Sequence, residues 1–264
     1  MKFCSLFSGS SGNSLFVQSQ NTSLLIDAGC TGKALTGAID SIGEKASDVK
    51  GILISHEHGD HTRGAGIMSR KFNIPIYANE KTWAAMERNL GKIAPENRRI
   101  LNGEASIGDF NVRSFRVPHD AASCIGFTLE DRAGKMMSSV TDMGVFTKEI
   151  REGIKDSDLI LIESNHDVEM LKYGPYPYDL KRRVLSELGH LSNEDSAAAI
   201  LSFLDDRHRQ IILGHLSGTN NVPELAFKTV ENILISAGVE IGTAGNLELK
   251  LASRIKPSAY TVIE

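Results

Sequence analysis

Short apolar segments bounded by turn residues dominate the first half of the chain. They have the length of β-strands and are rich in β-branched and aromatic residues, which favour strands. We therefore expect strands at Lys2–Phe7, Leu15–Gln18, Ser23–Asp27, Gly51–Ser55, Ile74–Ala78, Phe110–Val117, Cys124–Glu130 and Lys135–Val140. Four later segments share this pattern: Asp158–Glu163, Gln210–Leu213, Glu240–Thr243 and Leu247–Leu251.

Apolar residues at helical spacing fall between these strands or after them. They predict helices at Gly32–Ile42, Arg63–Arg70, Thr82–Leu90, Lys148–Lys155, Leu180–Leu188, Glu194–Leu204 and Pro223–Ala237. Strands come first, and helices and strands then mix, which favours sheet layers flanked by helices. No linker long enough to separate two domains is visible, so we expect one domain over residues 1–264.

The composition is that of an ordinary globular protein, with 41% hydrophobic and 23% charged residues among 264. It excludes a disordered tail protein, a collagen-like fibre and a disulfide-stapled miniprotein. Cys4, Cys30 and Cys124 are far apart and form no CxxC pair, so we expect neither a disulfide framework nor a cysteine zinc site. The net charge of −4 gives no global basic field, so a polyanionic substrate would need local positive charge.

The N-terminal segment has one Lys and only a few apolar residues before a run of Ser and Gly. A secretory signal has an apolar core of about 7–15 residues, and a membrane helix has about 20 apolar residues. The sequence shows neither pattern. We therefore expect a cytoplasmic protein with no membrane partner.

Three of the eight histidines fall within six positions, together with an aspartate: His56, His58, Asp60 and His61. They directly follow the apolar segment Gly51–Ile54. Side chains alternate at a strand end, so His56 and His58 can point the same way. Asp60 and His61 lie in the turn that follows. Imidazole nitrogens and carboxylates suit zinc, manganese or iron, and the motif therefore predicts a metal site.

The motif His56-x-His58-x-Asp60-His61 resembles the signature of the metallo-β-lactamase superfamily. The rest of the chain resembles that family in the same order, over almost its whole length, at Asp27 after the strand Leu24–Ile26, His119 after Val117-Pro118, Asp142 in Val140-Thr141-Asp142-Met143-Gly144, and His215 in Leu213-Gly214-His215-Leu216-Ser217. The resemblance implies an α/β fold, a four-layer αββα sandwich with a dinuclear metal site.

The resemblance also implies a ligand set for two divalent ions, Zn²⁺ or Mn²⁺ or else Fe²⁺. One ion would be held by His56, His58 and His119, the other by Asp60, His61 and His215, with Asp142 between them. Asp60 would be needed for catalysis as well, and Asp27 would support the metal loop from behind. Taken alone, His119 or His215 would equally suit a buried, hydrogen-bonded histidine, and Asp142 a helix or turn cap.

Two further histidines are candidates for roles beside the metals. His190 precedes a predicted helix, and Ser192 with Asp195 resembles a capping box, so this segment can simply start a helix. The phosphodiesterase branches of the superfamily carry an extra histidine before the last ligand, which implies that His190 protonates a leaving oxygen. His166 follows a predicted strand, and we expect it behind the ligands or in a structural role.

Four segments resemble one subgroup, the YycJ (WalJ) proteins of Gram-positive bacteria. They are Ser8–Ser14, Glu163–His166, Gly189–Asn193, and Gly214–Ser217 followed by Asn220-Asn221. The resemblance implies 5′-to-3′ exonuclease action on DNA and a role in mismatch repair. It implies nucleic acid as the partner, in particular a DNA 5′ end, and leaves a homodimer open.

Candidate substrate contacts lie near these motifs. Three tyrosines, Tyr176 among them, stand close to Lys181 and Arg182, a pattern that suits stacked bases and phosphates but equally a proline-stiffened loop beside a solvated helix face. Further polar groups for a terminal phosphate are offered by Ser10, Ser11, Asn13, Ser192 and Asn193. The first three would equally suit a plain glycine-rich hairpin.

The leading hypothesis is therefore a dinuclear-metal phosphodiesterase that acts on nucleic acid. Fold alone does not exclude a small-molecule hydrolase, either a cyclic phosphodiesterase or a thioester or lactone hydrolase. A non-catalytic regulatory protein is a third possibility, disfavoured because every expected ligand is present.

Overall fold

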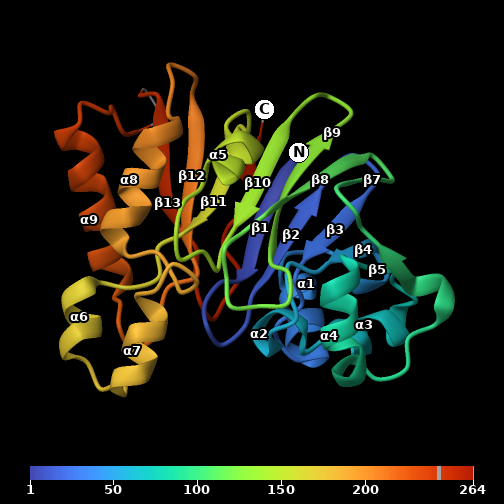
Figure 1. Ribbon diagram of the computed structural model, residues 1–264. Coiled ribbons are helices and arrows are strands. Elements are labelled where there is room, and N and C mark those ends of the chain that lie inside the picture. Colours follow the sequence, from blue (N-terminus) through green and yellow to red (C-terminus); the bar gives the residue numbers. More distant parts are fainter. Residues whose placement is uncertain (243–244, 264) are drawn as a thin grey trace.

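Two seven-stranded sheets pack face to face in the computed structural model, which describes residues 1–242 and 245–263 (Figure 1). The strand order of the first sheet is β14 (Thr261–Val262), β1 (Lys2–Phe7), β2 (Ser14–Gln18), β3 (Ser23–Ile26), β4 (Val49–Leu53), β5 (Ile76–Ala78) and β6 (Arg98–Ile100). Strands β3 to β6 run parallel to one another. Their carboxyl ends therefore meet at one edge of the sheet.

The second sheet is also part parallel and part antiparallel. Its strand order is β13 (Leu247–Leu251), β12 (Arg209–Gly214), β11 (Leu159–Glu163), β10 (Met136–Val140), β9 (Ile125–Asp131), β8 (Phe110–Arg116) and β7 (Glu104–Ile107). Strands β10 to β13 are parallel. Because β9 is antiparallel to both of its neighbours, β8 also runs in the direction of β10.

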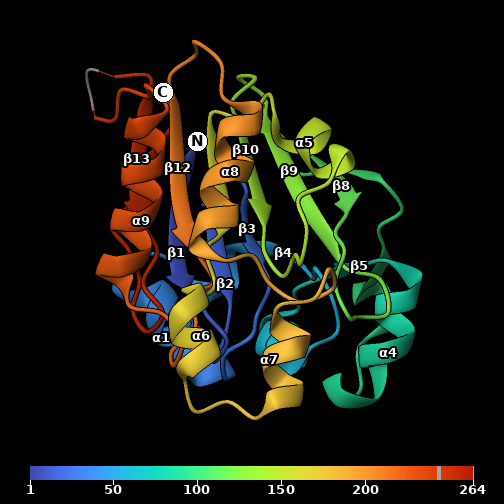
Figure 2. The same cartoon turned by 60° about the vertical axis from the view of Figure 1, so that its left-hand side comes forward.

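Helices cover both outer faces (Figures 1 and 2). The first sheet is flanked by α1 (Gly32–Ser41), α2 (Gly59–Thr62), α3 (Ala65–Phe72) and α4 (Glu80–Leu90), the second by α5 (Lys148–Ile154), α8 (Asn193–Phe203) and α9 (Pro223–Ser236). The helices α6 (Val168–Tyr173) and α7 (Tyr178–Val184) lie at one end of the sandwich. Two short 3₁₀ turns span Ala46–Asp48 and Pro95–Asn97.

Three apolar clusters hold these layers together. One lies between the first sheet and its helices and contains Trp83, and one lies between the second sheet and its helices and contains Phe203. The third joins the inner faces of the two sheets, where Phe3 and Phe127 are buried. The arrangement is an αββα sandwich, which confirms the predicted fold class.

Local sequence explains most element boundaries. Asn79 caps α4, because its side chain accepts a hydrogen bond from the N–H of Thr82, and the helix therefore starts two residues before the predicted Thr82. The predicted helix Arg63–Arg70 is α3, which begins at Ala65, after Gly64, whose N–H donates to the carbonyl of Ala28. The short helix α2 lies before the predicted range and was not expected. No described helix is long and apolar enough to cross a membrane.

Some expected elements differ from the structure. The expected strand Glu240–Thr243 shows only an isolated bridge at Ile241 in its described part, and Thr243 lies outside the described residues. The predicted helix Leu180–Leu188 is α7, which begins at Tyr178 and ends at Val184. Strands β6, β7 and β14 and helix α6 were not expected, because they are short, and in β6 every residue is exposed.

Candidate metal centre

The candidate ligands all follow the carboxyl ends of strands. The strand β4 leads to His56 and His58, while His119, Asp142 and His215 follow β8, β10 and β12 of the other sheet. In open sheets with parallel strands, the loops at the carboxyl ends form the crevice in which ligands bind. Packing the two sheets together thus brings side chains from distant parts of the sequence to one point.

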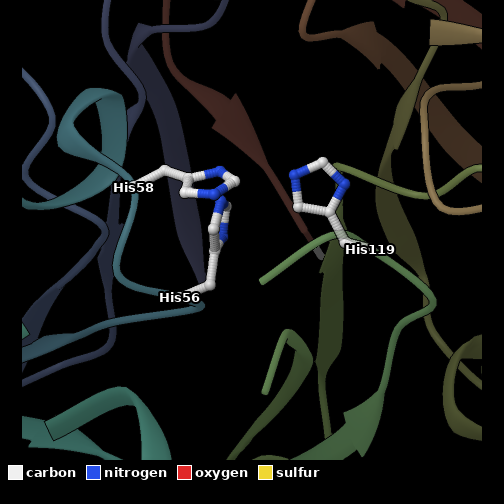
Figure 3. A group of neighbouring side chains, drawn as sticks. All are labelled: His56, His58 and His119. Atoms are coloured by element: carbon white, nitrogen blue, oxygen red, sulfur yellow. The ribbon is translucent and has the colours of Figure 1, made fainter. Parts of the chain in front are cut away.

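The first group is formed by His56, His58 and His119, whose nitrogens lie within 4.8 Å of one another. Figure 3 shows the rings of His56 and His58 on one side and the ring of His119 facing them from the other sheet. The ring centroids of His56 and His119 are 5.1 Å apart. Three converging imidazoles are a typical set of protein ligands for zinc.

The second group is formed by Asp60, His61 and His215, whose ligand atoms also lie within 4.8 Å of one another. Asp60 and His61 belong to the single turn α2, and Oδ2 of Asp60 lies 3.6 Å from Nε2 of His61 and 4.0 Å from Nε2 of His215. The side chain of Asp60 is 24% exposed, so it borders the open part of the site.

Asp142 lies between the two groups. Its Oδ1 is 3.8 Å from Nε2 of His119, and its Oδ2 is 3.2 Å from both Nε2 of His61 and Nδ1 of His215. Each carboxylate oxygen therefore faces a different histidine group. A carboxylate in this position has the geometry needed to contact two cations.

Several buried atoms of the site have no hydrogen-bond partner among the described residues. They are Nε2 of His56, Oδ2 of Asp142 and Nδ1 of His215. A buried polar atom without a partner costs about 1–3 kcal/mol, so such atoms are rare unless something else binds them. These atoms belong to groups whose ligand atoms converge, and nitrogen and carboxylate oxygen are ligands for zinc, manganese and iron. The residues therefore fit divalent metal ions.

Asp27 fixes the His61 ring from behind. Its Oδ2 accepts a hydrogen bond from Nδ1 of His61 at 2.7 Å, while its Oδ1 accepts from the N–H of Ser55 at 2.8 Å. With Nδ1 bound to Asp27, Nε2 of His61 faces Asp142 and is the atom that a metal ion would bind after displacing its proton. The side-chain amide of Asn13 contacts the same ring, and its Nδ2 lies 3.1 Å from Nε2 of His61.

In the metal-free protein, the neighbouring carboxylates determine which histidine rings are protonated. Burial alone lowers the pKa of His215, but Asp142 and Glu163 raise this pKa to about 10. Burial likewise lowers the pKa of His61, and Asp142 and Asp27 raise it well above its usual value. Burial and the neighbouring His61 hold the pKa of His56 well below its usual value. Protons thus occupy the rings that face carboxylates.

Three residues of the site have left-handed backbone conformations. Asp27, Asp142 and His215 have φ angles of 60°, 60° and 53°. The only other described non-glycine residue of this kind is Asn73, at the end of α3. Such conformations cost of order 1–3 kcal/mol and cluster at functional sites, where surrounding structure enforces them. Here they turn three side chains toward the site directly after strands.

Glu163 belongs to the site although sequence reasoning did not single it out. It is fully buried at the end of β11, and its Oε1 accepts a hydrogen bond from Nδ1 of His190 at 2.7 Å. Its ligand atoms converge with those of Asp142, His190 and His215. Burial raises the pKa of Glu163, but His190 and His215 lower it to about 2. The sequence signals were its place at the end of an apolar strand and the segment Glu163–His166, whose resemblance to the YycJ subgroup gave Glu163 no role.

Comparison with known proteins places this site in a family. The sequence matches the family described as the Beta-lactamase superfamily domain over residues 22–216. It is 42% identical over 246 residues to the exodeoxyribonuclease YycJ of Bacillus anthracis, covering 92% of this chain and 93% of that protein. It is 42% identical over 247 residues to the exodeoxyribonuclease WalJ of Streptococcus pneumoniae serotype 2, with 91% of each covered.

The chain belongs to the metallo-β-lactamase superfamily, in the family of YycJ and WalJ. The protein is therefore an enzyme of the hydrolase class. Among solved structures, the metallo-β-lactamase fold protein YhfI from Bacillus subtilis has a TM-score of 0.70 at 16% identity, covering 98% of this chain and 99% of that one. This likeness shows the fold. The expected family is confirmed.

Two further predicted residues, His166 and Ser192, are buried and lie outside the converging ligand groups. His166 is buried, and neither ring nitrogen has a hydrogen-bond partner among the described residues; burial lowers its pKa to about 4. It is absent from the converging ligand groups. Ser192 is buried as the cap of α8 and accepts from the N–H of Asp195.

Asn193 is fully buried in an amide network. Its side chain exchanges hydrogen bonds with Asn221 and accepts one from the hydroxyl of Ser164. The Asn221 amide donates in turn to the carbonyls of Ser164 and Asn165. This network joins the loops after β11 and before α8. With its amide used in this way, we do not retain Asn193 as a substrate contact.

The exposed candidates lie on two segments. Ser10 and Ser11 are exposed in the turn between β1 and β2. Arg182 is exposed on α7, whereas Tyr176 is half-buried, and Nζ of Lys181 donates to the carbonyl of Lys172.

Proposed function

We propose that this protein is a metal-dependent exodeoxyribonuclease that hydrolyses DNA phosphodiesters from a 5′ end. The observation that carries the proposal is the position of Asp142, whose two oxygens face separate histidine groups. The named activity of the YycJ and WalJ relatives supports a DNA substrate. A role in mismatch repair, a cytoplasmic location and a homodimer remain predictions.

In this proposal two divalent ions are held by separate groups. His56, His58 and His119 would hold one, Asp60, His61 and His215 the other, and Asp142 would contact both. Bound divalent ions supply positive charge for phosphoryl oxygens and lower the pKa of water. This charge also resolves the difficulty of a protein with net charge −4 acting on a polyanion.

In this proposal His190 protonates the leaving oxygen. Its Nδ1 is engaged by Glu163, which leaves Nε2 for the substrate. Burial lowers the pKa of His190, but the Glu163 and Asp142 carboxylates raise it above its usual value, which favours the protonated ring. The ring lies 5.3 Å from those of both His119 and His215, beside both metal groups.

The proton balance of hydrolysis gives Asp60 and His190 complementary roles. Water adds to phosphorus and loses a proton, while the bond to the 3′ oxygen breaks and that oxygen gains a proton. His190 supplies the second proton. In this proposal Asp60, which is partly exposed, accepts the first proton.

End-labelled DNA tests the proposal directly. Chelator-treated protein resupplied with Mn²⁺ or Zn²⁺ should release labelled mononucleotides from 5′-labelled DNA before the rest of the strand is shortened. Asp60→Ala should abolish cleavage while the fold survives. The exposed Asp206→Ala, on the loop before β12, is the matched control and should cleave normally. Full activity of Asp60→Ala, or turnover of acyl lactones without any phosphodiester cleavage, would refute the proposal.

A further inference from the structure

The segment 168–188, here called the α6–α7 arm, exposes large side chains that no packing in the described structure explains. Tyr173 is 84% exposed and Tyr178 is 73% exposed, one at the end of α6 and the other at the start of α7. Leu185 and Leu188 are about half exposed. Large apolar and aromatic side chains are mostly buried in a core, so two solvent-exposed tyrosine rings five positions apart require another explanation.

The α6–α7 arm is fixed beside the candidate metal centre. The Arg183 guanidinium forms an ion pair with Asp120, and its Nη2 lies 2.9 Å from Oδ1 of that carboxylate. Asp120 directly follows His119, and its N–H donates to the carbonyl of Leu188. In Figure 1, α6 and α7 lie at the same end of the molecule as α2, which carries Asp60. The arm therefore borders the site.

Cations accompany the exposed rings. The guanidinium of Arg182 lies 5.8 Å from the centroid of the Tyr178 ring, and it is exposed. Lys181 ties α7 to α6 through its hydrogen bond to the carbonyl of Lys172. Helix α7 carries three basic residues and one acidic residue, in a chain whose net charge is −4. Helix α7 of the arm is thus basic as well as aromatic.

We propose that the α6–α7 arm binds unpaired nucleotides of the DNA substrate, with bases stacked on Tyr173 and Tyr178 and a phosphate at Arg182. Exposed aromatic faces beside cations are the features that bind single strands without sequence preference. Bases inside a duplex are already stacked on both faces, so the arm selects single-stranded segments. This inference rests on the proposed nuclease function, and it makes a single-stranded end the preferred substrate.

Equilibrium binding tests the proposal without turnover. Metal-loaded protein is titrated into a fluorescent, 5′-phosphorylated oligothymidylate with phosphorothioate linkages, which resist hydrolysis, and into a blunt duplex of the same length. Tyr173→Ala and Tyr178→Ala should each weaken single-strand binding about tenfold, since stacking contributes ~1–3 kcal/mol per base. Duplex binding should change less than about twofold, and Tyr178→Phe should restore single-strand binding.

The matched control is Ile255→Ala, which removes an equally exposed apolar side chain outside the arm and should leave binding unchanged. Unchanged single-strand affinity of the double tyrosine variant would overturn the inference, and so would equal losses on duplex and single strand. A change in oligomer mass without a change in DNA affinity would also overturn it, since the arm would then bind a second copy. A protein that binds single strands through the tyrosines but cleaves no DNA would refute the nuclease function alone.

Discussion

Glu163 and His190 form a buried carboxylate–imidazole pair, with 2.7 Å between Oε1 of Glu163 and Nδ1 of His190. The other oxygen of Glu163 accepts a hydrogen bond from the N–H of Met143, directly after Asp142. One side chain thus connects the loop that carries Asp142 to the loop that carries His190. Since Glu163 fixes the His190 ring and raises its pKa, we regard it as a positioning residue.

Replacing Glu163 by glutamine tests this role. Glu163→Gln keeps the shape but removes the charge that raises the pKa of His190, so the protonated ring is lost at lower pH. We expect kcat on DNA to fall by about 100-fold at neutral pH, and the alkaline limb of its pH profile to move to lower pH. Metal content should stay at the wild-type value. A loss of bound metal with an unmoved pH profile would instead make Glu163 a ligand.

His190→Ala tests proton donation through the leaving group. An alkoxide leaving from DNA needs a proton, whereas p-nitrophenolate does not. The variant should therefore lose about 10²–10⁴-fold in kcat on DNA but much less on bis(p-nitrophenyl) phosphate. Steady-state kinetics on both substrates give the comparison. Equal losses on the two would contradict the assignment.

Asp27 should control metal affinity from outside the ligand set. Asp27→Asn removes the negative charge that holds Nδ1 of His61, and we expect metal affinity to fall by about 10–100-fold. Excess metal should restore most of the activity. Asp109→Asn is the matched control, because Asp109 is also buried and hydrogen-bonded but accepts from Ser19 and Asn21 instead. Equal metal affinities of both variants would argue against the role of Asp27.

Metal binding should release protons. The pKa of His215 is raised to about 10 and that of His61 lies well above its usual value, so both rings are protonated at pH 7 without metal. A metal ion must displace these protons, and its affinity should therefore rise with pH. Calorimetry in buffers of different ionisation enthalpy should show about two protons released per chain at pH 7.

The same shifts fix the sign of a stability effect in the metal-free protein. Because the pKa of His215 is higher in the folded state than its usual 6.5, its stabilising effect is complete below pH 6.5. That effect is lost as the pH rises toward about 10. Metal-loaded protein should not show this loss. Proton release near zero, with an affinity independent of pH, would contradict the assignment of His61 and His215 as ligands.

The family pattern was recognisable because its first motif is local. His56, His58, Asp60 and His61 lie within six positions, and the strand before them is apolar. Glu163 had no such signal, since its partner His190 is 27 positions away and only the sheet order brings them together. The left-handed backbone of Asp142 is likewise imposed by packing and has no mark in the sequence.

The solvent exposure of the candidate side chains could not be predicted from the sequence either. Asn193 looked available at a helix start, but it is consumed by hydrogen bonds with Asn221. The sequence pattern predicts Tyr176 as a substrate contact in the α6–α7 arm. In the structure Tyr173 and Tyr178 are far more exposed than Tyr176. The strand β6 was missed because alternation is absent when every residue of a strand faces solvent.

Metal titration of the chelator-treated protein tests the central claim most directly. Cleavage of 5′-labelled DNA is followed together with metal content as Mn²⁺ or Zn²⁺ is added. We predict no cleavage without metal, and activity that rises with bound metal and levels off at two ions per chain. Undiminished cleavage by metal-free protein would contradict the account, as would a protein that holds two ions and cleaves no phosphodiester.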